Sequence, residues 1–188
     1  LIHFHDIVLP GEYWKEWIKD KHNILFLLII LFAFFLRLYY LNANSVVWWD
    51  EADYLASAKH FFFDVPYNYN PQRGILFPVL IGILFSLGFG ETATKFIVVL
   101  LPSLGIVALT YLLGKQMYSK KVGLIAAAFM STFWASLFWT ARFSNDFLAL
   151  FFQLAALYCF WRGVVKKHES YFVWLFGLFL GLAFVTRA

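Results

Sequence analysis

Ile24-Leu25-Phe26-Leu27-Leu28-Ile29-Ile30-Leu31 is the centre of an apolar run from Asn23 to Leu41 that holds one charged residue, Arg37. A helix needs about 20 mostly apolar residues to cross the hydrocarbon core of a bilayer, so this run is long enough to span a membrane. Further apolar runs follow it, and the 188-residue chain is 62% hydrophobic, with a mean hydropathy of +0.72. A soluble domain averages roughly 45–50% apolar residues. The composition therefore predicts an all-α, polytopic helical membrane protein.

The segment ahead of this run, residues 1–22, is polar and amphipathic. Trp14, Trp17 and Ile18 recur at helical spacing, with lysines between them. An aromatic face opposite a basic face is typical of a helix that lies on the membrane surface. We therefore divide the chain into an interfacial N-terminal segment, residues 1–22, and a transmembrane module, residues 23–188. Asn23 can cap the first span of this module.

Beyond the first run, residues 48–54 read Trp-Trp-Asp-Glu-Ala-Asp-Tyr, which places three carboxylates within four residues. Only 14% of the chain is charged. Acids beside a membrane segment are costly to desolvate, so they mark a candidate functional site. The same acids also suit the first turn of a helix, where the backbone dipole favours negative charge. Ser45 or Asp50 can cap such a helix, which we expect to run to about Phe63 with Tyr54 on its packed face.

The segment from Gly74 to Phe89 is apolar but too short for a span. It holds about 15 apolar residues, where a span needs about 20, and Pro78 lies near its start. We interpret it as a helix that lies in the outer interface or dips partway into the bilayer. Residues 42–92 then form one long outer loop with juxtamembrane helices.

Four further spans are predicted, which brings the total to about five. They cover residues 95–114, 122–140, 146–161 and 171–187. If residues 74–89 do not cross, the Lys115–Lys121 and Arg162–Lys167 clusters fall inside together with the N-terminus, as the positive-inside rule favours. Asp146 then lies on the same side as Asp50. Because the basic residues form such short clusters between apolar runs, the net charge of +4 indicates orientation in a membrane and not a nucleic-acid partner.

This topology gathers acidic and basic side chains at the outer membrane face. They are Asp50, Glu51, Asp146, Arg73 and Arg142, with Arg37 and Arg187 at span ends. A carboxylate can take the proton of an acceptor hydroxyl that attacks a sugar carbon, and an arginine can stabilise a leaving phosphate with paired hydrogen bonds. Structural alternatives stay open. Arg37 and Arg187 can snorkel to the interface, and Asn145 or Asp146 can cap the helix that follows.

The order of these residues resembles the N-terminal module of the GT-C superfamily of membrane glycosyltransferases. The likeness is closest to the dolichyl-phosphate-mannose protein mannosyltransferase-like and aminoarabinose transferase-like group. It is carried by Leu36-Arg37-Leu38-Tyr39-Tyr40-Leu41, Asp50-Glu51-Ala52-Asp53-Tyr54 with Ala58, Pro78, Phe89-Gly90, Arg142-Phe143-Ser144-Asn145-Asp146 and Thr186-Arg187. Each motif is short, and their order around the spans is the more specific feature. Members of the group are much longer, so we expect this chain to be a fragment of a larger GT-C fold.

The resemblance implies an inverting glycosyltransferase that works at the extracytoplasmic or lumenal face. It would move a sugar from a polyprenyl- or dolichyl-phosphate donor to a protein, lipid or glycan acceptor. It implies Asp50 as the general base with Glu51 beside it, and Arg73 as a ligand of the donor phosphate. Asp146 would shape the site or, as in oligosaccharyltransferases, bind a divalent metal. We add to the substrate-binding set Arg142, Arg37, Arg187 and Tyr54. The expected location is the cell membrane, or the endoplasmic reticulum in a eukaryote.

Two other classes fit part of the pattern. A GT-C-like protein without activity would act as a subunit or scaffold, and it would be expected to lack the Asp50 carboxylate, which is present. A transporter or channel subunit would carry ionisable residues near the centres of its spans, whereas Arg37 and Arg187 lie near span ends. We therefore favour the glycosyltransferase.

Overall fold

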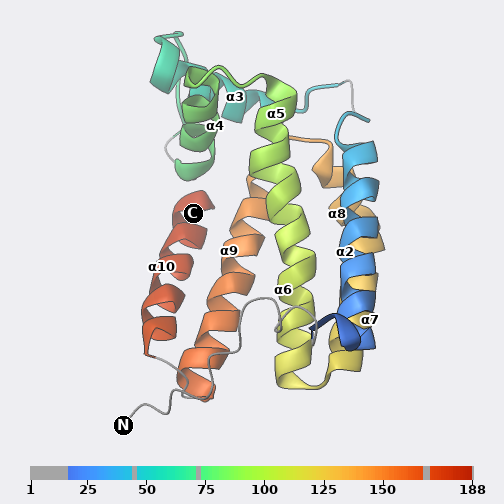
Figure 1. Ribbon diagram of the computed structural model, residues 1–188. Coiled ribbons are helices and arrows are strands. Elements are labelled where there is room, and N and C mark those ends of the chain that lie inside the picture. The colour runs from blue at the N-terminus through green and yellow to red at the C-terminus, as the bar shows by residue number, and fades with distance from the viewer. Residues whose placement is uncertain (1–16, 44–45, 71–72, 167–169, 188) are drawn as a thin grey trace.

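The computed structural model describes residues 17–43, 46–70, 73–166 and 170–187. Every regular element in these ranges is a helix (Figure 1), which confirms the predicted all-α membrane fold. The helices are α2 (Lys21–Tyr40), α3 (Trp49–Phe63), α4 (Leu76–Ser86), α5 (Glu91–Lys95), α6 (Leu101–Met117), α7 (Lys120–Thr132), α8 (Trp134–Thr140), α9 (Asn145–Phe160) and α10 (Tyr171–Thr186). A π-helical segment, Phe96–Leu100, joins α5 to α6, and another, Trp161–Val165, extends α9. Most of the predicted interfacial segment, residues 1–16, lies outside the described ranges, and residues 17–19 are helical.

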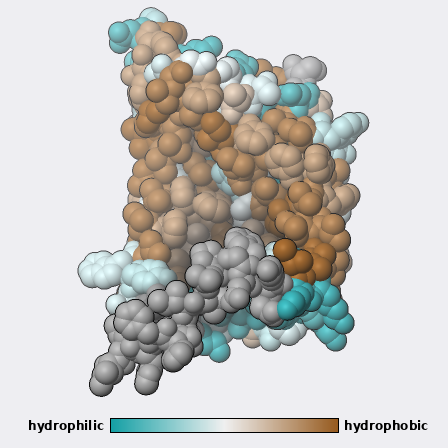
Figure 2. All heavy atoms as spheres, in the orientation of Figure 1, coloured by the Kyte–Doolittle hydropathy of each residue, from teal (hydrophilic) through white to brown (hydrophobic). Residues whose placement is uncertain are grey.

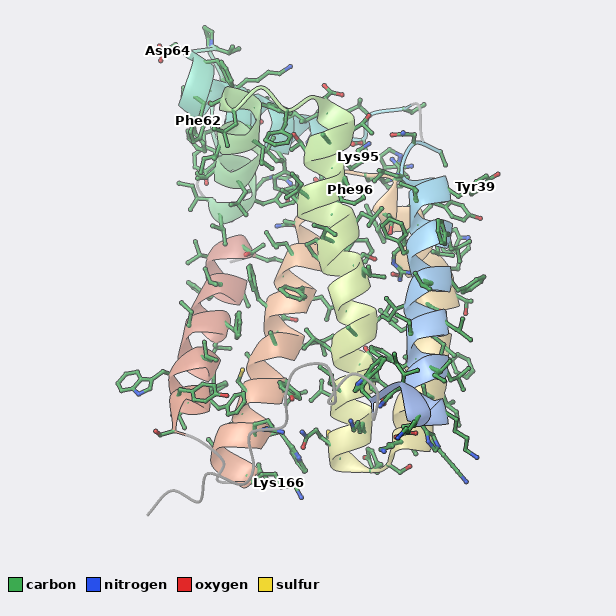
Figure 3. All side chains as sticks on the ribbon, viewed as in Figure 1. Tyr39, Phe62, Asp64, Lys95, Phe96 and Lys166 are labelled. Atoms are coloured by element: carbon green, nitrogen blue, oxygen red, sulfur yellow. The ribbon has the colours of Figure 1, made fainter. Side chains whose placement is uncertain are left out.

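The long helices α2, α6, α7, α9 and α10 run along the molecule, while α3 and α4 lie together at one end (Figure 1). We call this end the α3 end. The most extensive contacts join α9 to α10 and α6 to α7. Tyr39, Asp64 and Lys95 lie at the α3 end and Lys166 lies at the opposite end (Figure 3). The segment of α4 therefore does not run the length of the bundle, in agreement with the interpretation of residues 74–89.

The surface matches a membrane setting. Hydrophobic residues cover the middle of the molecule, and hydrophilic residues gather at its two ends (Figure 2). Large apolar side chains stand exposed along the helices, among them Phe35 and Trp174, which are 62% and 82% exposed. Patches of this extent are unusual on a soluble monomer and mark contact with lipid or protein.

The sequence predicted about five spans. Within the described residues, three continuous helical stretches are long and apolar enough to cross a membrane: Lys21–Tyr40, Glu91–Met117 and Asn145–Val165. A fourth results if α7 and α8, which are bent by 50° relative to each other, count as one broken span. The predicted fifth span is α10, which has only 16 residues. At 1.5 Å per residue it is about 24 Å long, less than the roughly 30 Å hydrocarbon core.

The helix α3 is held against the bundle by a shared apolar core. Tyr54 and Ala58 of α3 pack with Phe77 and Ile81 of α4 and with Phe147 of α9. The Tyr54 and Phe77 rings meet edge to face, with their centroids 5.2 Å apart. This packing fixes the first turn of α3, with Asp50 and Glu51, beside the start of α9.

The caps of α2 and α9 differ from the predicted ones by a few residues. Asp20 caps α2, and its Oδ1 accepts the N–H of His22 at 2.9 Å. Asn23, the predicted cap, lies inside the helix and donates from Nδ2 to the carbonyl of Trp17 at 3.0 Å. Ser144, and neither Asn145 nor Asp146, caps α9. Short polar side chains one position apart are nearly equal as caps, so the sequence pattern does not separate them.

The start of α3 also differs from the prediction. The helix begins at Trp49, so Asp50 lies within its first turn and is not the cap. Glu51, the third residue of the helix, accepts the backbone N–H of Trp48 with Oε2 at 3.4 Å. Ser45, the other predicted cap, lies outside the described residues. The carboxylate of Asp50 is therefore free for other contacts.

Candidate active site

A cavity of about 240 Å³ lies at the α3 end, where four parts of the chain meet. Its lining consists of Asp50, Tyr54, Arg73, Gly74, Asn145, Asp146 and Arg187. We call it the Asp50 cavity. Five of the predicted site residues line it: Asp50, Tyr54, Arg73, Asp146 and Arg187. The fold therefore brings together side chains that are widely separated in sequence, as the topology predicted.

Arg73 links the carboxylates of this cavity. Its Nη2 lies 2.7 Å from Oδ1 of Asp50 and 2.9 Å from Oδ2 of Asp53. Residues three apart are neighbours on a helix surface, so Asp50 and Asp53 face the same guanidinium. Burial disfavours the charge of Arg73, but the contacts with Asp50, Tyr54 and Asp53 together outweigh it, and the pKa of Arg73 is raised. The Asp50 side chain stays 64% exposed, so a ligand in the cavity can reach it.

Arg187 and Asp146 form a second pair on the adjoining wall. Nη1 of Arg187 is in close contact with Oδ1 of Asp146. The other carboxylate oxygen, Oδ2, accepts the hydroxyl of Ser144 at 2.9 Å. Arg187 follows directly after α10 and is 62% exposed. Its guanidinium is thus held in place and still open to the cavity.

Close backbone contact sets the distance between the two walls. A Cβ atom on Gly74 would lie 2.1 Å from the carbonyl oxygen of Thr186, which no side chain permits. Nδ2 of Asn145 donates to that same carbonyl at 3.0 Å. Gly74 follows Arg73 and Thr186 precedes Arg187, so this contact places the two arginines on adjoining walls.

A second cavity, of about 330 Å³, shares Asp146 and Arg187 with the first. It lies between the α7–α8 break and α9, and most of its lining is apolar. The other lining residues are Met130, Phe133, Ala135, Ser136, Trp139, Phe147, Ala149, Leu150 and Gln153. A polar cavity and a largely apolar one therefore meet at the Arg187–Asp146 pair.

Glu51 occupies a different environment from Asp50. It is buried, and its Oε1 accepts the backbone N–H of Phe143 at 3.0 Å. Nζ of Lys95 lies 3.8 Å from the same oxygen and donates to the carbonyl of Ala141 at 3.1 Å. Glu51 thus ties α3 to the loop between α8 and α9 and to the end of α5.

Arg37 lies apart from the Asp50 cavity and does not snorkel to the interface. Its side chain is fully buried, and all five N–H donors of its guanidinium are used. The acceptors are Ser103 Oγ, Ser136 Oγ and the carbonyls of Ala33, Met130 and Ser131. The last two carbonyls belong to the final turn of α7, where a helix break leaves backbone oxygens without intrahelical partners.

Arg142 is also separate from the Asp50 cavity. It is 6% exposed and lies between α8 and α9, against the ring of Trp48. Burial lowers the pKa of its guanidinium. The predicted set therefore divides into five residues around one cavity, and Glu51, Arg37 and Arg142 outside it.

The sequence model of the dolichyl-phosphate-mannose-protein mannosyltransferase family matches residues 72–188, more than half of the chain. The chain belongs to this family. No curated protein and no solved structure matches it. The matched region includes Arg73, Arg142, Asp146 and Arg187, whereas Asp50 precedes that region. The family consists of membrane glycosyltransferases, in agreement with the resemblance seen in the sequence.

A divalent metal does not fit the donor set around Asp146. In the described part of this mannosyltransferase-family chain, no group of three or more His, Cys, Asp or Glu side chains is placed to hold a metal ion. Asp146 itself is engaged by Arg187 and Ser144.

Four residues that shape the site were not predicted as part of it: Asp53, Gly74, Lys95 and Asn145. Asp53 could have been found, because it lies three residues after Asp50 and so on the same helix face. Asn145 was predicted only as a cap. The roles of Gly74 and Lys95 depend on contacts with distant backbone and carried no local signal.

Proposed function

We propose that this chain transfers a sugar from a polyprenyl-phosphate donor to an acceptor hydroxyl, with Asp50 as the general base. The observation that carries the proposal is the lining of the Asp50 cavity, in which an exposed carboxylate and two arginines surround one space. A base and a set of phosphate ligands are the two components that transfer from a sugar phosphate requires. Membership of the mannosyltransferase family supports the same reaction class.

The donor would lie across the two cavities that meet at Arg187. Its phosphate would contact Arg73 and Arg187, because guanidinium groups bind phosphate oxygens with paired, charge-assisted hydrogen bonds. Its prenyl chain would follow the 330 Å³ cavity, where apolar side chains predominate. Asp146 would act as a positioning residue, since its carboxylate holds Arg187. Tyr54 would form part of the wall beneath Arg73.

In the reaction, an acceptor hydroxyl attacks the anomeric carbon as the bond from that carbon to the phosphate oxygen breaks. The attack comes from the face opposite the leaving group, so the anomeric configuration inverts. The hydroxyl proton passes to the Asp50 carboxylate, and the polyprenyl phosphate leaves with the bonding electrons. Arg73 and Arg187 stabilise the charge that develops on the leaving phosphate.

Asp53 explains how Arg73 can serve both the base and the phosphate. In the structure Arg73 contacts Asp50 and Asp53 together. When the donor phosphate recruits Arg73, Asp53 can keep the guanidinium in place while Asp50 becomes available for the proton. Tyr67 donates to Oδ1 of Asp53 at 2.5 Å and fixes that carboxylate in turn.

The α3 end would face the outside of the cell or the lumen. The basic residues Lys115, Lys120 and Lys121 flank the turn from α6 to α7, and Arg162 and Lys166 lie at the end of α9, all at the opposite end of the bundle (Figures 1 and 3). Basic residues in short loops favour the cytoplasmic side. The proposed donor and acceptor would therefore meet at the outer leaflet.

The experiment compares Asp50→Asn with the matched variant Asp64→Asn in membranes that contain the full-length protein. Asn keeps the size of the side chain but cannot accept the proton, and general-base catalysis typically contributes about 10²–10⁴-fold. Sugar transfer from a polyprenyl-phosphate-sugar should fall by that order in Asp50→Asn. Asp64 ends α3 outside the cavity with φ 53°, a conformation that Asn accepts readily, so Asp64→Asn should keep normal transfer. Near-normal transfer by Asp50→Asn would remove Asp50 from the role of base.

A further inference from the structure

Arg142 is a buried arginine whose guanidinium lacks hydrogen-bond acceptors for some of its N–H groups in the described part of the chain. The residue is 6% exposed. Its guanidinium carbon lies 3.9 Å from the centroid of the Trp48 ring and 4.7 Å from that of Phe138. These aromatic faces stabilise a cation, but they accept no strong hydrogen bond. Nε and Nη1 are both buried and have no hydrogen-bond partner.

Arg37 shows what a structural arginine in this molecule looks like. It uses every N–H donor, each on a carbonyl or a hydroxyl. Leaving buried donors on a charged group without acceptors is costly, because the group loses its water and gains nothing in return. Glu51 attracts the Arg142 charge electrostatically, but its oxygens accept from Phe143 and Trp48 and supply no acceptor to the buried Nε and Nη1. The unfilled donors therefore point to a ligand.

A cavity of about 190 Å³ offers the place for that ligand. It is lined by Tyr40, Ala43, Trp134, Leu137, Phe138, Ala141 and Arg142. We call it the Arg142 cavity. It shares no lining residue with the Asp50 cavity. Arg142 also lines a space of about 20 Å³ beside Asp50, which has room for little more than one water. The larger cavity is thus the one that can admit an anion.

We propose that Arg142 binds the phosphate of a lipid, at a second anion site on the α8 side of Trp48. Phosphate supplies several acceptor oxygens and a negative charge, which suit the unpartnered guanidinium nitrogens Nε and Nη1. The rest of the lining is aromatic or aliphatic apart from the Tyr40 hydroxyl, which favours a phosphate that carries an apolar chain. The volume is below the roughly 300 Å³ of a typical small-molecule pocket, so it suits a headgroup and not a whole lipid.

The position of the cavity also suits a lipid. Tyr40 ends α2 at the α3 end, and Trp134 is 70% exposed. Exposed tyrosine and tryptophan side chains favour the depth of lipid headgroups. A lipid in the adjoining leaflet could therefore reach Arg142 with its phosphate. The proposal does not depend on the proposed sugar transfer, because it rests on Arg142 alone.

The test measures binding of dodecyl phosphate to the purified full-length protein in neutral dodecyl maltoside micelles, by calorimetry or ³¹P NMR. Inorganic phosphate is the comparison. If both cavities bind phosphate, the wild type takes up two dodecyl phosphates. Arg142→Gln should lose one site, with affinity there about tenfold weaker or more, because hydrogen bonds to a charged group are lost. Arg142→Lys should restore part of the affinity, and inorganic phosphate should bind more weakly than dodecyl phosphate.

Two more variants separate the possible failures. Ala43→Phe fills the Arg142 cavity from an exposed position and leaves Arg142 itself unchanged, so it should also lose this site while the fold is kept. Arg73→Gln should leave binding at the Arg142 site unchanged. If Arg73→Gln also leaves total dodecyl phosphate binding unchanged, the proposed donor site in the Asp50 cavity is wrong and the Arg142 site remains. If both Arg142→Gln and Ala43→Phe bind dodecyl phosphate as the wild type does, the proposal is overturned. Arg142 would then be a cation that only the aromatic rings stabilise. Equal binding of inorganic phosphate would overturn the assignment to a lipid.

Discussion

The hydrogen-bonded cluster around Arg37 and the Asp50 cavity lie in the same half of the molecule, yet they use arginine in opposite ways. Arg37 is fully buried and contacts only neutral acceptors, two hydroxyls and three carbonyls. Arg73 and Arg187 contact carboxylates, line an open cavity, and have side chains that are 26% and 62% exposed. The residue type is the same, and the partners and the access of solvent differ.

The difference separates groups that hold the fold from groups that can exchange partners. Arg37 joins α2 to Ser103 of α6, Met130 and Ser131 of α7, and Ser136 of α8. It also places a cation at the C-terminal end of α7, which the helix dipole favours. A ligand could displace none of these contacts without leaving backbone oxygens unpaired. In the Asp50 cavity, by contrast, a phosphate can replace a carboxylate as the partner of an arginine.

The largest effect on stability is expected for Arg37→Met. The methionine fills space but leaves the carbonyls of Met130 and Ser131 without their donor, and each unsatisfied buried group costs about 1–3 kcal/mol. We expect the free energy of unfolding to fall by about 3 kcal/mol, measured by denaturant titration in mild detergent. A loss below about 1 kcal/mol would mean that water or neighbouring helices satisfy these carbonyls, and the contrast with the Asp50 cavity would weaken.

Gly74→Ala should have the next largest effect, because it breaks the contact that places Arg73 beside Arg187. The new Cβ would collide with the carbonyl of Thr186, and forced overpacking typically costs about 1–3 kcal/mol. The matched control is Gly177→Ala, since a Cβ on Gly177 meets nothing within 4 Å. The control should keep its unfolding midpoint, or raise it slightly through better helix propensity. Equal midpoints for the two variants would show that the Gly74 loop can move away from α10.

Glu51→Gln tests the buried member of the acidic pair. Gln can still accept the N–H of Phe143, but it leaves the ammonium of Lys95 without its nearby charge. We expect a loss of about 1–2 kcal/mol in unfolding free energy, because the partly buried Lys95 ammonium then lacks its counter-ion. The double variant Glu51→Gln/Lys95→Met should recover part of that loss in a double-mutant cycle. If Glu51→Gln instead reduced transfer as strongly as Asp50→Asn with stability unchanged, Glu51 would join the catalytic group.

The sequence predicted the helical membrane fold, the position of α4, and the meeting of Asp50, Arg73, Asp146 and Arg187 at one end. These follow from the length of apolar runs and from the side of the membrane on which charges fall. Such rules act on whole segments, so they place residues at an end of the bundle without fixing their contacts.

The same rules did not show that Asp50 and Arg73 line a cavity while Glu51 and Arg37 are buried outside it. Whether a side chain faces a cavity depends on the rotation and packing of its helix. The break between Thr132 and Trp134 had no proline or glycine to reveal it, and that break creates the carbonyls that Arg37 binds. The predicted span of residues 171–187 ends only one residue beyond α10, so its shortfall from about 20 residues was already present in the sequence.

Arg73→Gln should have the smallest effect on stability and still a clear effect on function. Partly exposed ion pairs contribute about 0–1 kcal/mol, so we expect the unfolding free energy to change by about 0.5 kcal/mol or less.

Because the pKa of Arg73 is raised above its already high ordinary value, the wild-type side chain stays charged at every pH in which the protein is studied. The Arg73→Gln variant therefore lacks this positive charge at every pH. The donor phosphate loses a charge-assisted hydrogen-bond partner. Affinity for a short-chain polyprenyl-phosphate-sugar should fall by about tenfold, while Lys59→Gln, an exposed basic residue of α3 outside the cavity, should bind normally. A destabilisation near that of Arg37→Met would show that Arg73 is also part of the fold, and unchanged donor affinity would leave Arg73 as a partner of Asp50 and Asp53 alone.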